Sequence, residues 1–140
     1  MKKKLSFLIF YWGPPILLAL LIFKLSSGAV PSASSVYWQD FAFKKSAHML
    51  FFGVLAVLLY RALIKSGMSK KKAVVWAILA STFYGMTDEY HQSFSQAREA
   101  RVRDVGFDGI GSVLSVLFIY YIVPKLPPSI LEIAKRLEIS

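Results

Sequence analysis

The sequence predicts an all-α fold, a four-transmembrane-helix bundle that forms a single membrane domain over residues 1–140. The chain of 140 residues is 56% hydrophobic and only 18% charged, which is more apolar than a typical soluble domain. Its apolar residues fall into four runs, each near the length of about 20 residues that a spanning helix needs. The basic residues that give the chain its net charge of +9 flank those ends of the runs that would share one face of the membrane. Such an asymmetry is typical of the residues that set membrane topology. We therefore expect the lipid bilayer as a partner and no nucleic acid.

The first predicted helix covers residues 5–25. Pro14 and Pro15 interrupt it, so we expect a kink there. A cleaved signal peptide is the rival interpretation, because lysines precede the run and Ser27-Gly28-Ala29 resembles a small-residue cleavage site. The apolar region of a signal peptide is about 7–15 residues long, and this run is longer. An uncleaved span is therefore favoured.

The other predicted helices cover residues 46–64, 73–92 and 104–123. The third is strictly apolar only as far as Met86, after which a polar cluster follows. Pro124 ends the fourth helix. The serine-rich stretch 26–45 is predicted to be an outer loop, and residues 129–139 are predicted to form a short amphipathic tail.

Lysine and arginine set the predicted orientation. If the N-terminus lies in the cytoplasm, four spans place the loop 61–72 and the tail on the same side. That side then carries Lys2–Lys4, Lys70–Lys72 and the whole net charge of +9, while acids and bases balance on the other side. Because basic residues favour the cytoplasmic face, we expect a multi-pass protein of the cell membrane with both termini inside.

Ionisable residues are concentrated between Thr87 and Asp108, in a chain that is otherwise poor in charge. At about 1.5 Å per residue, Glu89 lies about 24 Å above Ala73, and Asp108 lies about 22 Å above Val123. His48 lies about 24 Å above Ile64 by the same measure. A charge at such a depth is costly unless it is paired or hydrated. Three helices are therefore expected to form one half-buried polar site near the outer leaflet.

The candidate residues of this site fall into two groups. Three are acid–base candidates for a catalytic role: Glu89, His48 and Asp108. Six are candidates for substrate binding: Asp88, His91, Gln92, Arg98, Arg103 and Asp104. Asp104 and Asp108 share a helix face at spacing i, i+4, and Asp88, His91 and Gln92 share another. Gly106, Gly109 and Gly111 would let the fourth helix approach a neighbour closely.

Each candidate also has a structural alternative. His48 could bond to a backbone carbonyl at the interface, Asp88–Gln92 could form a wet loop that ends the third helix, and the arginines could neutralise Asp104 and Asp108. A metal site is a further alternative, because His48, Glu89, His91, Asp104 and Asp108 offer ligands suited to Zn or Mn. No H-E-x-x-H motif is present, so the metal and any cofactor stay unknown. The absence of cysteine excludes disulfides, thiolate zinc ligands and a thiol nucleophile.

Several motifs resemble those of the VanZ-like family. They are Trp12-Gly13-Pro14-Pro15; Ile22-Phe23-Lys24-Leu25-Ser26-Ser27; Lys45-Ser46-Ala47-His48 with Phe51-Phe52-Gly53; Asp88-Glu89-Tyr90-His91-Gln92-Ser93-Phe94; and Arg98, Arg103-Asp104-Val105 and Asp108-Gly109-Ile110-Gly111. The likeness covers most of residues 10–120. It departs from the family before Arg98, where Gln96-Ala97 replace the usual Pro-Gly. The family is named after a protein of teicoplanin resistance, so the resemblance implies a membrane fold and a role in the cell envelope, and it supplies no reaction.

Two classes of function stay open. The protein could bind or shield an envelope lipid head group, a wall precursor or a glycopeptide without chemistry, and so act in glycopeptide (teicoplanin) resistance. Alternatively, it is a membrane-embedded enzyme on a lipid-linked or phosphate-bearing substrate. In that case Glu89 or Asp108 would move the proton, a histidine would assist, and arginines would hold the anion. A transporter is a weaker third option, since no repeat builds a pathway.

Overall fold

The computed structural model describes residues 2–28, 32–94 and 101–139, and within these ranges all regular structure is helical. This confirms the all-α prediction. The elements are α1 (Lys2–Phe7), η1 (Leu8–Trp12), α2 (Gly13–Ser26), α3 (Tyr37–Lys65), α4 (Lys70–Gln92), α5 (Val102–Leu117), η2 (Phe118–Ile122), η3 (Val123–Lys125) and α6 (Pro128–Arg136).

Three helical stretches in the described part of the chain are long and apolar enough to cross a membrane. They are Lys3–Ser26, Tyr37–Lys65 and Val102–Lys125. α4 has a suitable length of 23 residues, but it begins with three lysines and ends in the polar cluster, which lowers its mean hydropathy. The prediction of four spans is therefore supported for three of them.

α3 begins earlier than predicted. The sequence interpretation placed residues up to 45 in a loop, but the helix starts at Tyr37. Lys44 and Asp40 form an i,i+4 ion pair of 2.7 Å, and the Asp40 carboxylate also accepts the Ala33 N–H at 2.8 Å. These contacts support a helical turn in a segment whose mixed polarity is also typical of a loop.

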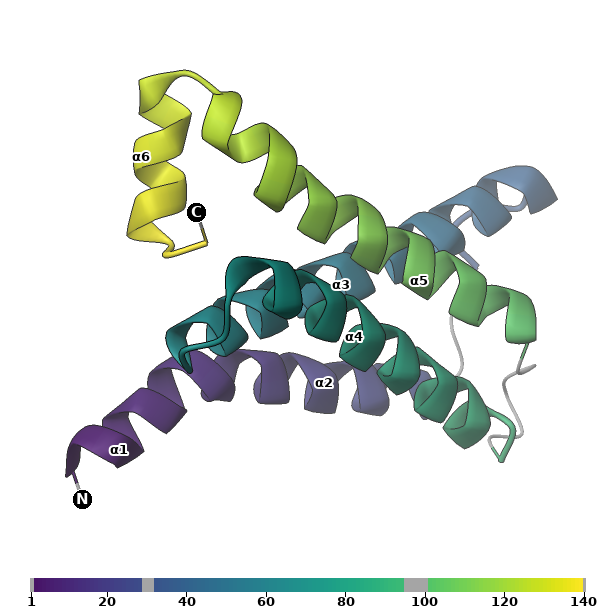
Figure 1. Ribbon diagram of the computed structural model, residues 1–140. Helices are drawn as coiled ribbons and strands as arrows, with labels where there is room; N and C mark the ends of the chain where they lie inside the picture. Colours follow the sequence, from purple (N-terminus) through teal and green to yellow (C-terminus); the bar gives the residue numbers. More distant parts are fainter. Residues whose placement is uncertain (1, 29–31, 95–100, 140) are drawn as a thin grey trace.

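The two prolines near the N-terminus produce a local change of helix type. The turn before them, η1, is π-helical, with the Gly13 N–H donating to the Leu8 carbonyl. Pro14 has no N–H to offer the Phe10 carbonyl four residues earlier. Arg61 on α3 donates to that carbonyl instead, at 3.4 Å. The helix axis bends between α1 and α2 as expected (Figure 1).

α3, α4 and α5 pack against one another, and α2 lies beside α3 and α4 (Figure 1). The two chain ends and the α3–α4 turn lie at one end of this bundle. Glu138, just after α6, joins them. Its carboxylate accepts hydrogen bonds from Tyr11 at 3.2 Å, Arg61 at 3.0 Å and Lys65 at 2.7 Å. The predicted amphipathic tail is thus a helix, α6, and Glu138 after it is hydrogen-bonded to the bundle.

Small residues set the spacing of the packed helices. A Cβ at Gly111 on α5 would collide with the backbone of Met49 on α3, so close approach at this predicted position is confirmed. A Cβ at Gly109 would make an ordinary contact of 3.5 Å with Thr82, and one at Gly106 would meet nothing within 4 Å. The expectation of close approach is therefore wrong for Gly106, because no atom of a neighbouring helix lies within 4 Å of its Cβ position.

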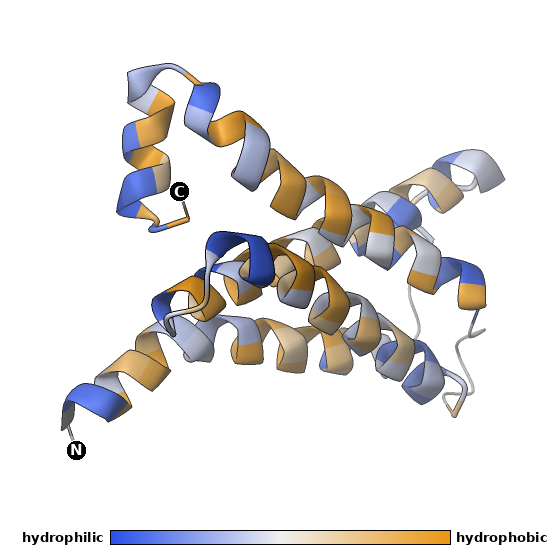
Figure 2. Ribbon diagram, in the orientation of Figure 1, coloured by the Kyte–Doolittle hydropathy of each residue, from blue (hydrophilic) through white to orange (hydrophobic). Residues whose placement is uncertain are grey.

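Large apolar side chains face outward along the bundle, and orange apolar positions run along the middle of the helices (Figure 2). Two small apolar clusters lie inside, around Tyr60 and around Phe52. The buried side of α4 carries Ser81, Asp88, Glu89 and Gln92 among small residues. A polar interior with an apolar exterior is expected for helices solvated by lipid.

Candidate functional site

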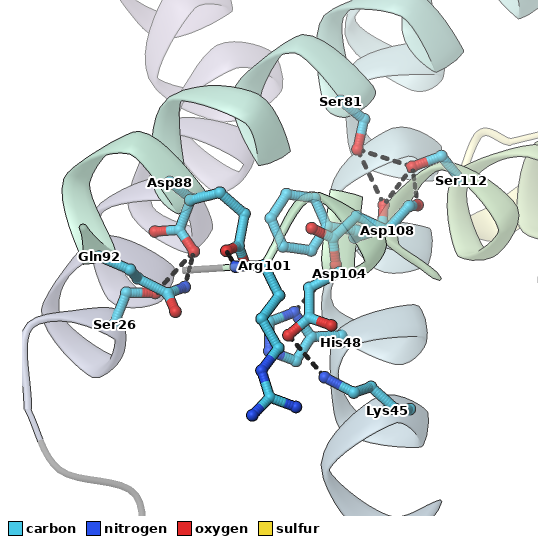
Figure 3. Close-up of polar contacts among 12 residues, drawn as sticks. Ser26, Lys45, His48, Ser81, Asp88, Gln92, Arg101, Asp104, Asp108 and Ser112 are labelled. Atoms are coloured by element: carbon cyan, nitrogen blue, oxygen red, sulfur yellow. Dashed lines mark hydrogen bonds and ion pairs between the residues drawn. The ribbon is translucent and has the colours of Figure 1, made fainter. Parts of the chain in front are cut away.

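Polar side chains from α2, α3, α4 and α5 gather in one cluster (Figure 3). The helix ends that carry them lie opposite the chain termini (Figure 1). The α4 and α5 carboxylates of this cluster are buried, with exposed fractions of 3% for Asp88, 6% for Glu89, 7% for Asp104 and 0% for Asp108. The structure therefore brings the predicted acids to one level. We call these four carboxylates, with His48 and Lys45, the acid cluster.

His48 on α3 pairs with Asp108 on α5. Its Nδ1 lies 3.0 Å from Oδ1 of Asp108, and its ring is stacked parallel to that of Phe52. Gly85 on α4 leaves the space for this carboxylate, because a Cβ there would lie 2.9 Å from Oδ2 of Asp108. The imidazole is fixed through Nδ1, which leaves Nε2 on its other edge for another partner.

Lys45, one helical turn before His48, forms an ion pair with Asp104, one turn before Asp108. The lysine ammonium also lies 5.6 Å from the Phe41 ring centroid and 5.8 Å from that of Phe107. α3 and α5 are thus joined by two successive polar pairs, and in each pair the basic group lies on α3 and the carboxylate on α5.

Asp88 connects α4 to α2. Its Oδ2 accepts hydrogen bonds from Ser26 Oγ and from Gln92 Nε2, both at 2.8 Å. His91 lies beside this group, with Nε2 3.0 Å from Ser27 Oγ and its ring centroid 4.1 Å from that of Phe23. Asp88, His91 and Gln92 therefore share a face, as their spacing predicts, and that face meets α2.

Glu89 lies on the other side of α4, toward α5. Its Oε2 accepts the backbone N–H of Arg101 at 2.8 Å. It is also close enough to His48, Asp104 and Asp108 to interact with them electrostatically. Glu89 thus faces the other members of the acid cluster on one side and the surface between α4 and α5 on the other.

The predicted arginines lie apart from the buried acids or outside the described residues. The guanidinium of Arg103 is stacked over the Phe41 ring, 5.0 Å from its centroid. The Asp104 carboxylate is paired with Lys45. The alternative in which an arginine neutralises Asp104 is therefore wrong for Arg103, because α5 turns that side chain toward the aromatic residues of α3. Arg98 lies outside the described residues.

Four carboxylate oxygens in the site are buried without a hydrogen-bond partner among the described residues: Asp88 Oδ1, Glu89 Oε1, Asp104 Oδ1 and Asp108 Oδ2. Buried acceptors of this kind need a donor, because leaving one unpaired costs about 1–3 kcal/mol. Within residues 2–28, 32–94 and 101–139, no group of three or more potential ligands has metal-binding geometry.

Sequence reasoning did not single out Ser26, Lys45, Ser81 and Ser112 as site residues. Ser112 Oγ donates to the Asp108 carbonyl at 2.8 Å and lies 2.9 Å from Ser81 Oγ, and Ser81 in turn donates to the Phe52 carbonyl at 3.1 Å. The signal for Lys45 was its i, i+3 spacing from His48, which places both on one helix face. The serines lacked such a signal, since hydroxyls are common in membrane helices.

These features define an α-helical membrane protein with a cluster of carboxylates buried at one end of its bundle. The family model VanZ/LLP1 matches residues 6–123. The chain therefore belongs to the VanZ/LLP1 family, and the predicted resemblance is confirmed. No curated protein matches the chain, and no solved structure does.

Proposed function

We propose that this protein spans the cytoplasmic membrane four times, with both termini inside, and that the acid cluster binds the polar part of an envelope amphiphile. The supporting feature for α4 as the fourth span is its outward face. Six large side chains recur there at helical spacing and are each more than half exposed: Val75, Trp76, Leu79, Phe83, Met86 and Tyr90. Its length of 23 residues corresponds to about 34 Å, enough for a hydrocarbon core of about 30 Å.

The observation that carries the binding function is the set of four unpartnered carboxylate oxygens. Ammonium and hydroxyl groups are the donors that suit such acceptors. Lipid head groups, wall precursors and glycopeptides all display donors of this kind. By holding such a group at the outer leaflet, the protein would shield it or keep it from its usual partner, which gives the family's link to teicoplanin resistance a physical basis.

Glycopeptide susceptibility tests this function. We expect expression of the protein in a susceptible host to raise the inhibitory concentration of teicoplanin, and expect Asp108→Asn and His48→Gln to remove the gain. Glu132→Gln is the matched control, because Glu132 is exposed on α6. Full protection by the two site variants at equal protein level would overturn the proposal. Absence of protection by the unmodified protein would overturn its glycopeptide branch.

The second candidate function is catalysis, and the His48–Asp108 pair favours it. A carboxylate that holds Nδ1 of an imidazole leaves Nε2 able to take up or donate a proton at a bound substrate. Glu89→Gln separates the two functions because it keeps the side-chain shape and removes the negative charge. Loss of function with unchanged ligand binding would indicate chemistry. Loss that always follows loss of binding would indicate shielding.

A further inference from the structure

A groove lies between α4 and α5, beside the acid cluster. Its volume is about 1020 Å³, and its walls are almost entirely apolar. The walls include Met86 and Tyr90 on α4 and Ile110 and Leu114 on α5, and these four side chains are each at least half exposed. From Val102 to Leu114 the groove follows about 18 Å of helix. It is thus long and apolar, and it lies on the outside of the bundle.

One buried acid belongs to the wall of this groove. Glu89 is 6% exposed and lines the groove, together with Arg101 and Ser93 near the end of α4. Its Oε2 is held by the Arg101 backbone N–H at 2.8 Å, whereas its Oε1 has no partner among the described residues. Glu89 thus places a carboxylate with one buried and unpartnered oxygen in the wall of an apolar groove, where the N–H or O–H of a ligand that enters the wall would satisfy it.

The groove wall contains a glycine that packing does not explain. A Cβ at Gly106 would meet nothing within 4 Å, so a larger residue would fit. Glycine within a helix costs about 1 kcal/mol relative to alanine. Its presence here keeps the groove open next to Glu89, which is the expected arrangement where a ligand occupies the space.

We propose that this groove holds the acyl chain of an amphiphile whose head group donates an N–H or O–H hydrogen bond to Glu89 Oε1. The proposal rests on the proposed function and names its ligand class. The chain contacts the apolar walls along α4 and α5, and the head group lies at the edge of the acid cluster. A lipid with a primary ammonium or a hydroxyl meets both requirements, and one with a quaternary ammonium meets only the first.

The test uses the full-length protein in nanodiscs that contain traces of a lipid with a photoreactive diazirine in its acyl chain. The head group is varied between ethanolamine, glycerol and choline, and the adducts are mapped by mass spectrometry. We expect ethanolamine or glycerol lipid to label the groove residues near Ile110 and Leu114 about tenfold more than choline lipid, as one hydrogen bond to a charged group would produce. The two donor head groups identify whether an ammonium or a hydroxyl is preferred.

Two variants and a matched control complete the test. Gly106→Leu blocks the groove beside Glu89 and should reduce labelling there, whereas Glu89→Gln should reduce the preference over choline and keep the acyl labelling. Ala80→Leu is the control, because Ala80 is also helical and exposed on α4 and does not line the groove. Even labelling of all outward faces, including Leu79 and Phe83, would overturn the proposal. So would equal labelling by all three lipids.

The outcome is distinguishable from that of the proposed function. Groove labelling combined with full protection by the Asp108 and His48 variants would leave the groove site standing and remove the proposed function. Loss of protection in those variants without specific groove labelling would do the reverse.

Discussion

The imidazole of His48 and the carboxylate of Asp108 meet at 3.0 Å although they lie 60 positions apart in the chain. The carboxylate is completely buried, with an exposed fraction of 0%. One turn away, Lys45 and Asp104 repeat the arrangement. The contact between α3 and α5 is therefore polar at the end that carries the site and apolar toward the other end, where Tyr60 and Val116 lie in the same cluster.

Removing the Asp108 carboxylate should destabilise the bundle. Asp108→Ala is expected to lower the free energy of unfolding by about 2–3 kcal/mol, the usual value of a hydrogen bond to a charged group. Asp108→Asn should cost less, because the amide oxygen can still accept from His48. Equilibrium unfolding in mixed detergent micelles measures both. Unfolding of the alanine variant at the same denaturant concentration as the unmodified protein would contradict the assignment.

Two glycines on α5 should respond to alanine in opposite directions. Gly111→Ala places a Cβ against the Met49 backbone, so we expect a loss of about 1–3 kcal/mol from overpacking. Gly106→Ala enters open space and should stabilise by up to about 1 kcal/mol through helix propensity. The two variants make the same chemical change, so each serves as the control for the other. Equal effects in unfolding measurements would refute the packing described for α5.

The attachment of the C-terminal tail to the bundle through Glu138 should depend on pH. The hydrogen bond from Lys65 lowers the pKa of Glu138, with desolvation opposing it and Arg61 and Tyr11 lowering it further. A carboxylate with a lowered folded-state pKa stabilises at pH values above about 4.3, its ordinary value, and that contribution is lost as the pH falls through the lowered value. A spin label at the exposed Ile133 should therefore gain mobility as the pH falls through the lowered pKa of Glu138.

Glu138→Gln is the control for the tail, and its label should be mobile at neutral pH as well. A transition near pH 6 would instead assign the effect to a histidine, and no transition in acid would show that Glu138 does not fasten the tail. Because the Glu138 carboxylate accepts hydrogen bonds from Tyr11, Arg61 and Lys65, variants of these three residues should reproduce the release.

The orientation can be tested directly because the chain contains no cysteine. Ser35→Cys, between α2 and α3, should react with an impermeant maleimide added to intact cells. Ser66→Cys, in the α3–α4 turn, should react only after permeabilisation. Both serines are exposed, so burial does not hide either label. Reaction of Ser66→Cys in intact cells would reverse the proposed topology.

Helix positions and the level of the site were predictable from sequence because both depend on local quantities. Apolar run length predicts which segments form long helices, and the rise per residue predicts that His48, Glu89 and Asp108 lie at one level along the bundle. The start of α3 at Tyr37 was missed because polar residues before Lys45 are equally typical of a loop and of a helix that extends beyond the membrane.

The partners within the site were not predictable from the same quantities. Which base meets Asp104 depends on how α3 and α5 rotate about their axes, and that rotation follows from close contacts such as Gly111 with Met49. Spacing along one helix identified Asp88 with Gln92, whereas the contribution of Ser26 needed the position of α2. Long-range pairs therefore required the structure.

The placement of the pairs has a consequence for biogenesis. When α4 leaves the ribosome with Asp88, Ser26 has already been synthesised on α2, and when α5 follows with Asp104 and Asp108, Lys45 and His48 are already present on α3. Each of these acids thus has a partner on a segment made before it, which reduces the time that a bare charge must spend in the bilayer. The order of translation therefore allows each polar pair to form as soon as its acid is synthesised. In a circularly permuted chain that starts at α4, the acids would be synthesised before their partners.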